Sequence, residues 1–142
     1  MKTVTGKLLL FALSMMTIGV NAGHAQIANH LDFKAAQPFT VGNTTLAAGS
    51  YTVRLAEFDS TIIEIASTSG HPAVMADTIS TQPDSSQGPS HLVFNKYKNV
   101  LALSQIFPGN GNTGYTLVQG HPEQLAAKTE TPTKQTVPAS GK

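Results

Sequence analysis

The chain has 142 residues, with nine Lys and Arg against eight Asp and Glu, and it contains no cysteine. A chain without cysteine has no disulfide framework and cannot be a lipoprotein anchored through an acylated cysteine. Its basic residues never cluster beyond Lys96 and Lys98. Such a surface cannot supply the many phosphate contacts that nucleic-acid binding requires, so we expect no nucleic-acid partner.

The beginning of the chain has the order of a secretory signal peptide. Two lysines precede an apolar run at residues 8–20, and small residues follow up to Ala25. The run is shorter than the roughly 20 apolar residues of a membrane-spanning helix, so we expect no membrane span. We predict that residues 1–25 are removed, with cleavage after Ala22 as the alternative, and that the protein is exported to the periplasm or the cell exterior. Losing two lysines leaves seven basic and eight acidic side chains, a net charge of −1.

A lead-in segment at residues 26–36 is compatible either with one helical turn or with an edge strand. After it, β-branched and aromatic residues recur at every second position between turn-forming residues, which predicts strands. The predicted strands lie at 38–41, 44–47, 50–55, 61–66, 73–79, 91–97, 100–107 and 115–118. In the clearest of them, Tyr51, Val53 and Leu55 alternate with polar residues and should be buried. Gly42 and Gly49 mark turns, where positive φ would make either glycine hard to replace.

A short helix is predicted for residues 122–128, because Pro122 suits a first helical position and Glu123 suits the positive end of the helix dipole. Residues 129–142 are rich in Thr, Pro and Ser, and we expect a flexible tail. The predicted fold is therefore all-β, with one β domain at 37–128. It is a single antiparallel β-sandwich or small barrel of about seven to eight short strands, with one short C-terminal helix.

Gly109 to Gly114 matches the G-x-G-x-x-G pattern of dinucleotide-binding loops. That motif functions where it opens a helix whose N-terminus holds the pyrophosphate. Here a predicted strand follows, so we interpret the glycines as a hairpin loop and expect no nucleotide cofactor.

Other candidate chemistry is sparse. A metal site would need distant residues such as His71, Asp77 and His91 to converge in space. The adjacent pair Ser90 and His91 does not form a nucleophile and base, because neighbours on a strand point to opposite faces. Glu57 and Asp59 are a pair of acids that could in principle act as a general acid and base. They lie where a strand ends in a turn, so we favour the interpretation that they are solvated turn residues. We therefore predict no catalytic, cofactor-binding or metal-binding residue.

Two stretches, 39–55 and 91–107, resemble a group of small exported bacterial proteins of uncharacterised function. The group shares V-G-N followed by L-P-A-G-x-Y-x-V, and a later L-V-F-x-x-Y. Here these are residues 41–43, 46–53 and 92–97, with Ala47 at the position where the group has proline. The resemblance implies an exported β domain and transfers no activity and no functional residue.

Composition, export and patterning together predict an exported, non-enzymatic β-domain that acts as a binding or structural module of the cell envelope. Its partner would be a protein or another envelope component, and its oligomeric state is open. One alternative is a self-assembling surface or adhesin-type subunit, in which the β-prone stretches 61–66 or 100–107 pair between chains if either lies at a sheet edge. A second alternative is a metal-binding or hydrolytic protein whose site is gathered in space.

Overall fold

The structure is a computed structural model that describes residues 30–56, 59–70, 74–82, 88–109 and 113–141. These residues form ten strands and one helix. The predicted signal peptide and both of its cleavage positions lie outside the described residues, as do His71 and Glu57.

Between residues 39 and 127 the bounds of the strands and the helix follow the sequence pattern closely. In chain order the elements are β1 (Leu31–Ala35), β2 (Phe39–Val41), β3 (Thr44–Leu46), β4 (Gly49–Ala56), β5 (Asp59–Ser67), β6 (Val74–Thr81), β7 (His91–Lys96), β8 (Leu101–Phe107), β9 (Gly114–Leu117), α1 (His121–Ala127) and β10 (Thr133–Gly141). The all-β prediction with one short C-terminal helix is confirmed.

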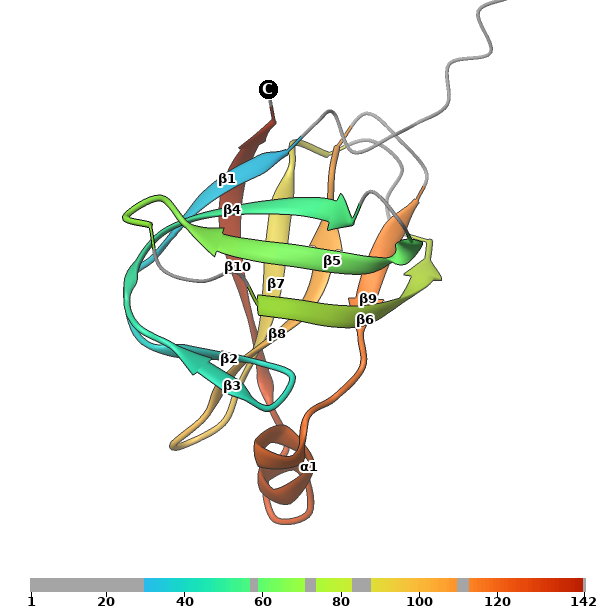
Figure 1. Ribbon diagram of the computed structural model, residues 1–142. Helices are drawn as coiled ribbons and strands as arrows, with labels where there is room; N and C mark the ends of the chain where they lie inside the picture. Colours follow the sequence, from blue (N-terminus) through green and yellow to red (C-terminus); the bar gives the residue numbers. More distant parts are fainter. Residues whose placement is uncertain (1–29, 57–58, 71–73, 83–87, 110–112, 142) are drawn as a thin grey trace, which may run out of the picture.

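Eight of the strands close into an antiparallel barrel, in the cyclic order β1-β4-β5-β6-β9-β8-β7-β10 (Figure 1). The spatial order β10-β7-β8-β9 is that of a Greek key, in which the fourth strand returns beside the first. The hairpin of β2 and β3 lies outside this ring and joins it through a parallel pairing of Thr40 with Ala102 on β8. Of the two predicted architectures, the chain therefore adopts the barrel.

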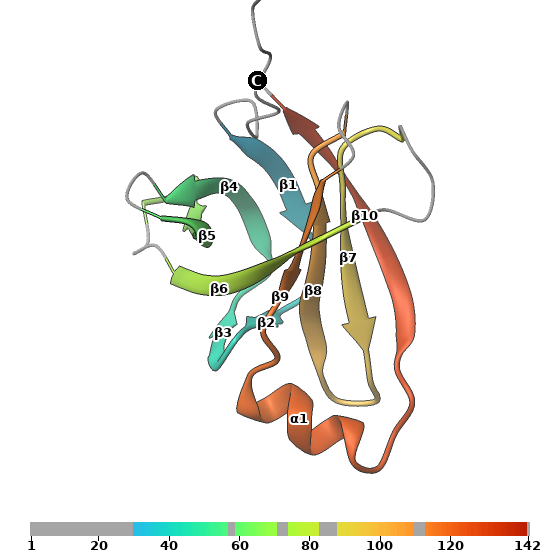
Figure 2. The same cartoon turned by 90° about the vertical axis from the view of Figure 1, so that its right-hand side faces the viewer.

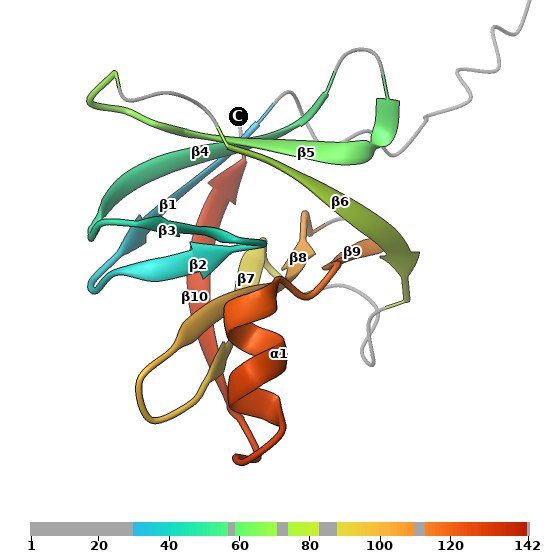
Figure 3. The same cartoon turned by 60° about the horizontal axis from the view of Figure 1, so that its bottom comes forward.

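Strand β6 connects the two halves of the barrel. Its first residues pair with Ile62–Ile65 of β5, and its last residues pair with β9. Figure 3 shows β6 running from the side of β5 to the side of β9. Because β6 pairs with β5 through its first residues and with β9 through its last, it joins the strands beside β5 to those beside β9 in one continuous sheet.

The prediction of a flexible C-terminal tail is wrong for residues 133–141. These residues form β10, which pairs with β7 from Thr133 to Pro138 and with β1 from Ala139 to Gly141. The same strand explains the lead-in segment. Because β10 and β4 flank β1 on both sides, β1 is an interior strand of the ring and neither a helical turn nor an edge strand.

The core is built from buried side chains of the barrel strands together with those of the β2–β3 hairpin. Four aromatic rings pack together in it, and Phe39 of β2 meets Tyr51 and Phe94 edge-on, at centroid distances of 5.2 and 5.6 Å. Each such pair contributes about 0.5–1.5 kcal/mol beyond its buried area. The expected burial of Tyr51 and Val53 is confirmed, whereas Leu55 is only half-buried. Its pairing register shifts immediately after it, where β4 ends.

The two predicted turn glycines differ. Gly42 has φ of +57° between β2 and β3, in the left-handed region that favours glycine. Gly49 does not have positive φ: it begins β4 and pairs with Ala35 of β1. The condition for a backbone constraint, positive φ, is therefore met at Gly42 and not at Gly49.

Candidate functional site

An open hollow of about 530 Å³ lies over β1, β4 and β10. Its residues are Asp32, Phe33, Lys34, Ser50, Tyr51, Thr68, Pro138, Ala139 and Ser140. Strand pairing explains its position. β1 continues to Ala35 along β4, but its pairing with β10 stops at Phe33 opposite Ala139. The hollow thus marks the place where β1 and β10 separate.

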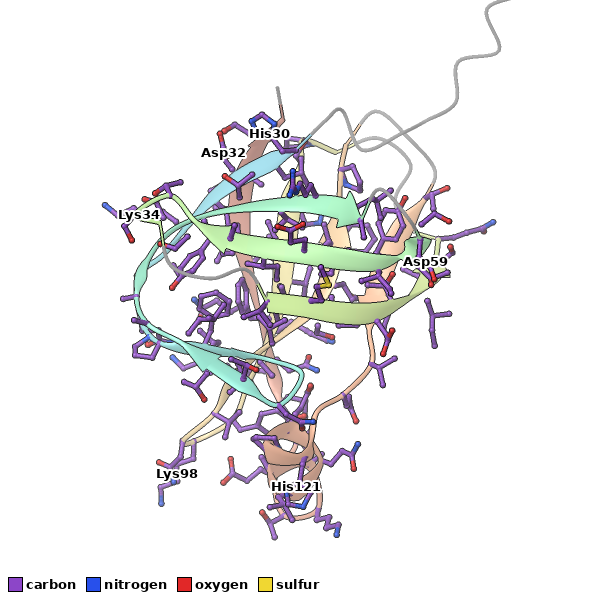
Figure 4. The ribbon with its side chains drawn as sticks, in the orientation of Figure 1. His30, Asp32, Lys34, Asp59, Lys98 and His121 are labelled. Carbon is purple, nitrogen blue, oxygen red and sulfur yellow. The ribbon has the colours of Figure 1, made fainter. Side chains whose placement is uncertain are left out.

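The carboxylate of Asp32 is held in place at this hollow. Its Oδ1 accepts a hydrogen bond from the hydroxyl of Thr52 at 2.7 Å, and its Oδ2 lies 3.8 Å from Nε2 of His30. Lys34 lies two positions along β1 on the same face and is exposed. Figure 4 shows His30 and Asp32 close together at one end of the molecule. The hollow therefore carries both signs of charge, with Asp32 on the part of β1 that pairs with both β4 and β10 and Lys34 on the part that pairs with β4 alone.

Hydroxyl groups and apolar surface complete the hollow. Ser50, Thr68 and Ser140 bring hydroxyls from three segments of the chain, and the Thr68 hydroxyl donates to the carbonyl of Ser50 at 3.2 Å. The Tyr51 hydroxyl is directed elsewhere, since it donates to the carbonyl of Ala47 at 2.7 Å. This arrangement can bind a polar ligand through hydrogen bonds and place it against apolar surface.

A second polar cluster is buried beneath α1. Glu123 is 3% exposed, and its Oε1 accepts hydrogen bonds from Asn95 at 2.6 Å, and from Tyr97 and Gln119 at 3.4 Å each. The Asn95 amide oxygen in turn accepts from Nζ of Lys134 on β10 at 2.7 Å. Burial, and then the negative charge of Glu123, raise the pKa of Tyr97 above its usual value. Every member has a partner, so the cluster joins α1, β7 and β10 and stabilises their packing.

The start of α1 is joined to the β2–β3 turn. Asn43 Oδ1 accepts a hydrogen bond from the backbone N–H of His121 at 2.7 Å, although the two residues are 78 positions apart. A Cβ placed on Gly120 would lie 1.8 Å from the carbonyl oxygen of Gly42, so only glycine fits there. Figure 2 shows α1 at the end of the barrel near this hairpin. The V-G-N motif thus serves as a turn and as a cap on a distant helix.

Exposed apolar side chains lie on β6 and at the end of β9. Met75 and Ile79 are 56% and 65% exposed, and Val118 is 51% exposed. They are near one another, because Asp77 lies between the first two and its carbonyl accepts from the N–H of Val118 at 3.1 Å. This is a small apolar surface on the outside of the barrel.

Two of the candidate residues from the sequence, Ser90 and His91, lie within the described residues, and each has a local partner. His91 stacks on Phe107 at 4.9 Å and its Nδ1 donates to the carbonyl of Pro89, while the Ser90 hydroxyl donates to the carbonyl of Pro108. Within the described ranges, no group of three His, Cys, Asp or Glu side chains could hold a metal ion. The trio of His71, Asp77 and His91 that a metal site would need is not tested by the structure, because His71 lies outside the described residues.

The remaining candidates have local structural roles. Asp59 Oδ1 accepts from both the backbone N–H and the hydroxyl of Thr61, and these bonds lower the pKa of Asp59. Its suggested partner Glu57 is outside the described residues. Gly109 follows β8 and Gly114 begins β9, and these two strands pair antiparallel. Residues 110–112 of the glycine-rich stretch lie outside the described residues.

Several of the best-connected polar residues were not candidates in the sequence. Asn95 lies within a predicted strand, Lys134 in a predicted tail, and Asn43 in a predicted turn. Each acts through a partner far along the chain, and no local pattern indicates such a partner. Glu123 was noted only for its place at the start of a helix.

Comparison with protein family models, with characterised proteins and with solved structures finds no match for this chain. Within the described ranges, no helix is long and apolar enough to span a membrane.

Proposed function

We propose that this protein is an exported, non-enzymatic module of the bacterial cell envelope that binds a polar envelope component in the hollow over β1, β4 and β10. The observation that carries the proposal is the separation of β1 from β10, which opens this hollow on an otherwise closed barrel. The hydroxyls and the oppositely charged Asp32 and Lys34 suit a ligand that has hydroxyl groups and both charge signs.

Peptidoglycan fragments have this chemistry, because they combine sugar hydroxyls with peptide carboxylates and amines. Binding in an open hollow would be weak, since only part of the ligand leaves water. Weak binding suits a module that meets its target at high local concentration in an envelope. Asp32 is held in position for this binding by Thr52 and His30.

Binding is tested by titrating the isotope-labelled mature chain, residues 26–142, with a mixture of soluble muropeptides and following backbone amide shifts. We expect the saturable shifts to be confined to β1, the start of β4 and the end of β10. A double variant, Lys34→Ala with Ser140→Ala, should lose them. The matched control is Lys98→Ala, on the β7–β8 turn at the far end of the molecule, and it should retain them (Figure 4). Absence of saturable shifts, or shifts centred elsewhere, would reject the site.

Export is tested separately by the intact mass of the protein recovered from the envelope fraction of expressing cells. A chain that begins at Gln26 is expected, or at Gly23 if cleavage follows Ala22. An uncut chain in the cytoplasm would reject export without bearing on the binding site.

The alternative of a self-assembling subunit cannot use the strand pairing that the sequence suggested for it. Pairing between chains was expected if β5 or β8 lay at a sheet edge, but β5 is paired with β4 and β6, and β8 with β7, β9 and β2. Edge pairing through these two β-prone strands is therefore not available in the closed barrel.

A further inference from the structure

Strand β10 closes the barrel while burying little apolar surface. Its side chains alternate between exposed and half-buried, and none of them is fully buried. The half-buried residues are Gln135, Val137 and Ala139, of which the last two pack against the core from its margin. The fully buried apolar residues all come from other parts of the chain. β10 is therefore held mainly by hydrogen bonds: those of its backbone to β7 and β1, and the side-chain bond from Lys134 to Asn95. Elements with little buried apolar surface open at a lower free energy than the core.

Two features define where β10 would detach. Pro138, which has no N–H for the ladder, lies at the point where β10 changes partner from β7 to β1. At the other end, Glu130 accepts a hydrogen bond from the backbone N–H of Lys98 at 2.6 Å and fixes the chain just before the strand. The residues between this anchor and Thr133 form a hinge, defined here as residues 131–132.

Removal of β10 would leave a slot in which an occupant pairs with β7 along its first part and with β1 along its last part. β7 offers its backbone at residues 91–96 and β1 at residues 31–33, both antiparallel to the occupant. The inward positions of the occupant lie opposite Phe94, Leu92 and Phe33. The slot thus fits an extended strand whose inward side chains, at alternate positions, are of medium or small size. β10 of a second copy meets this requirement and would form the same backbone hydrogen bonds.

We propose that β10 is an exchangeable strand, and that the slot between β7 and β1 binds β10 of a second copy of this chain. The exchange replaces every hydrogen bond of β10 with an identical bond to the second copy. The equilibrium between monomer and exchanged dimer therefore depends on the hinge and on protein concentration. This inference does not rest on the ligand proposed above, and it supplies an assembly route that does not need β5 or β8 at an edge.

The first test deletes the two hinge residues together with the anchor residue Glu130, residues 130–132, from the mature chain. Removing an odd number of residues would turn the inward side chains of β10 outward if the strand closed on its own barrel. Closure on a second copy restores the native register, so we expect a dimer with twice the mass of one chain by light scattering. The control inserts Gly-Ser-Gly after Glu130, and it should remain monomeric.

The second test uses the native hinge and the absence of cysteine. Lys96 and Thr133 are partners in the β7–β10 register, so chains carrying Lys96→Cys are mixed with chains carrying Thr133→Cys and oxidised at high concentration. Exchange predicts a disulfide-linked dimer in higher yield than from the off-register control, Lys34→Cys mixed with Thr133→Cys. A monomeric deletion variant, or equal yields from the two mixtures, would overturn the proposal. If the deletion variant aggregates without a defined mass, the cross-linking yields decide alone.

Discussion

At the scale of single residues, the structure is stabilised by polar contacts between segments that are distant in sequence. Asn43 is the clearest case, because its side chain caps a helix that begins 78 residues later. The residue at the N-cap position, Gly120, makes no side-chain cap of its own and fits against Gly42 only because it lacks a Cβ. The turn and the helix are therefore interdependent.

Replacing Asn43 with alanine should lower the free energy of unfolding by about 1 kcal/mol, because the N–H of His121 loses its acceptor. Asn43→Asp should restore most of this, since a carboxylate accepts the same bond and interacts favourably with a helix N-terminus. The measurement is urea unfolding. Asn99→Ala, in the β7–β8 turn, is the control and should change stability by less than about 0.5 kcal/mol. Equal effects at Asn43 and Asn99 would contradict the cap.

Tyr97 gives a prediction for alkaline pH. Burial and the nearby Glu123 carboxylate raise its pKa in the folded protein, so the unfolded chain loses this proton first as pH rises. The folded state then binds more protons than the unfolded state, and stability falls as pH rises past the usual tyrosine pKa of about 10. Its contribution is fully present below that pH.

The free energy of unfolding should therefore fall less steeply between about pH 9 and about pH 11 in Tyr97→Phe than in the parent chain. Burial also raises the pKa of Tyr115, so Tyr115→Phe should flatten the slope as well, and the double variant should be flattest. The measurement is urea unfolding at a series of pH values, compared by slope rather than by absolute stability. Identical slopes in all four proteins would reject this assignment.

At the scale of elements, the question is whether residues 133–141 form the paired strand β10 or a solvated tail. Val137 lies opposite Leu92 and is half-buried against the core, whereas its neighbour Thr136 is exposed. Aspartate at either position has the same low strand propensity, so the difference between the two variants reports which face each position occupies.

We expect Val137→Asp to be less stable than Thr136→Asp by about 1–2 kcal/mol, because a charge at position 137 would face apolar side chains. Chemical unfolding of the two variants side by side gives this difference. If residues 133–141 were a solvated tail, both substitutions would leave stability unchanged.

Sequence periodicity predicts β2 to β9 and α1 because each carries its own signal: alternating apolar residues, or proline and an acid at a helix start. β10 carries almost none. Val137 is its only large apolar residue, and its strand conformation comes from β1 and β7, which flank it in space. The hollow was unpredictable for the same reason, since it exists only where β1 and β10 separate. The buried Glu123 cluster likewise depends on Asn95 and Lys134 meeting from separate strands.

At the scale of the whole molecule, the barrel is closed by its first and last described strands. β1 and β10 pair with each other, β1 also pairs with β4, and β10 also pairs with β7, so the ring is closed only when both are in place (Figure 1). The proposed binding hollow and the proposed exchange slot both depend on this junction. A ligand in the hollow touches residues 138–140 of β10, and it should therefore hold the strand in place and oppose exchange between copies.

Native-state hydrogen exchange of the mature chain tests this closure most directly. The ladder amides of β10 should be protected well above the level of an unstructured peptide, yet exchange faster than those of β7 and β8, because β10 opens without global unfolding. Unprotected amides throughout residues 133–141 would contradict the closed barrel. Protection equal to that of β7 would retain the barrel but contradict a detachable strand.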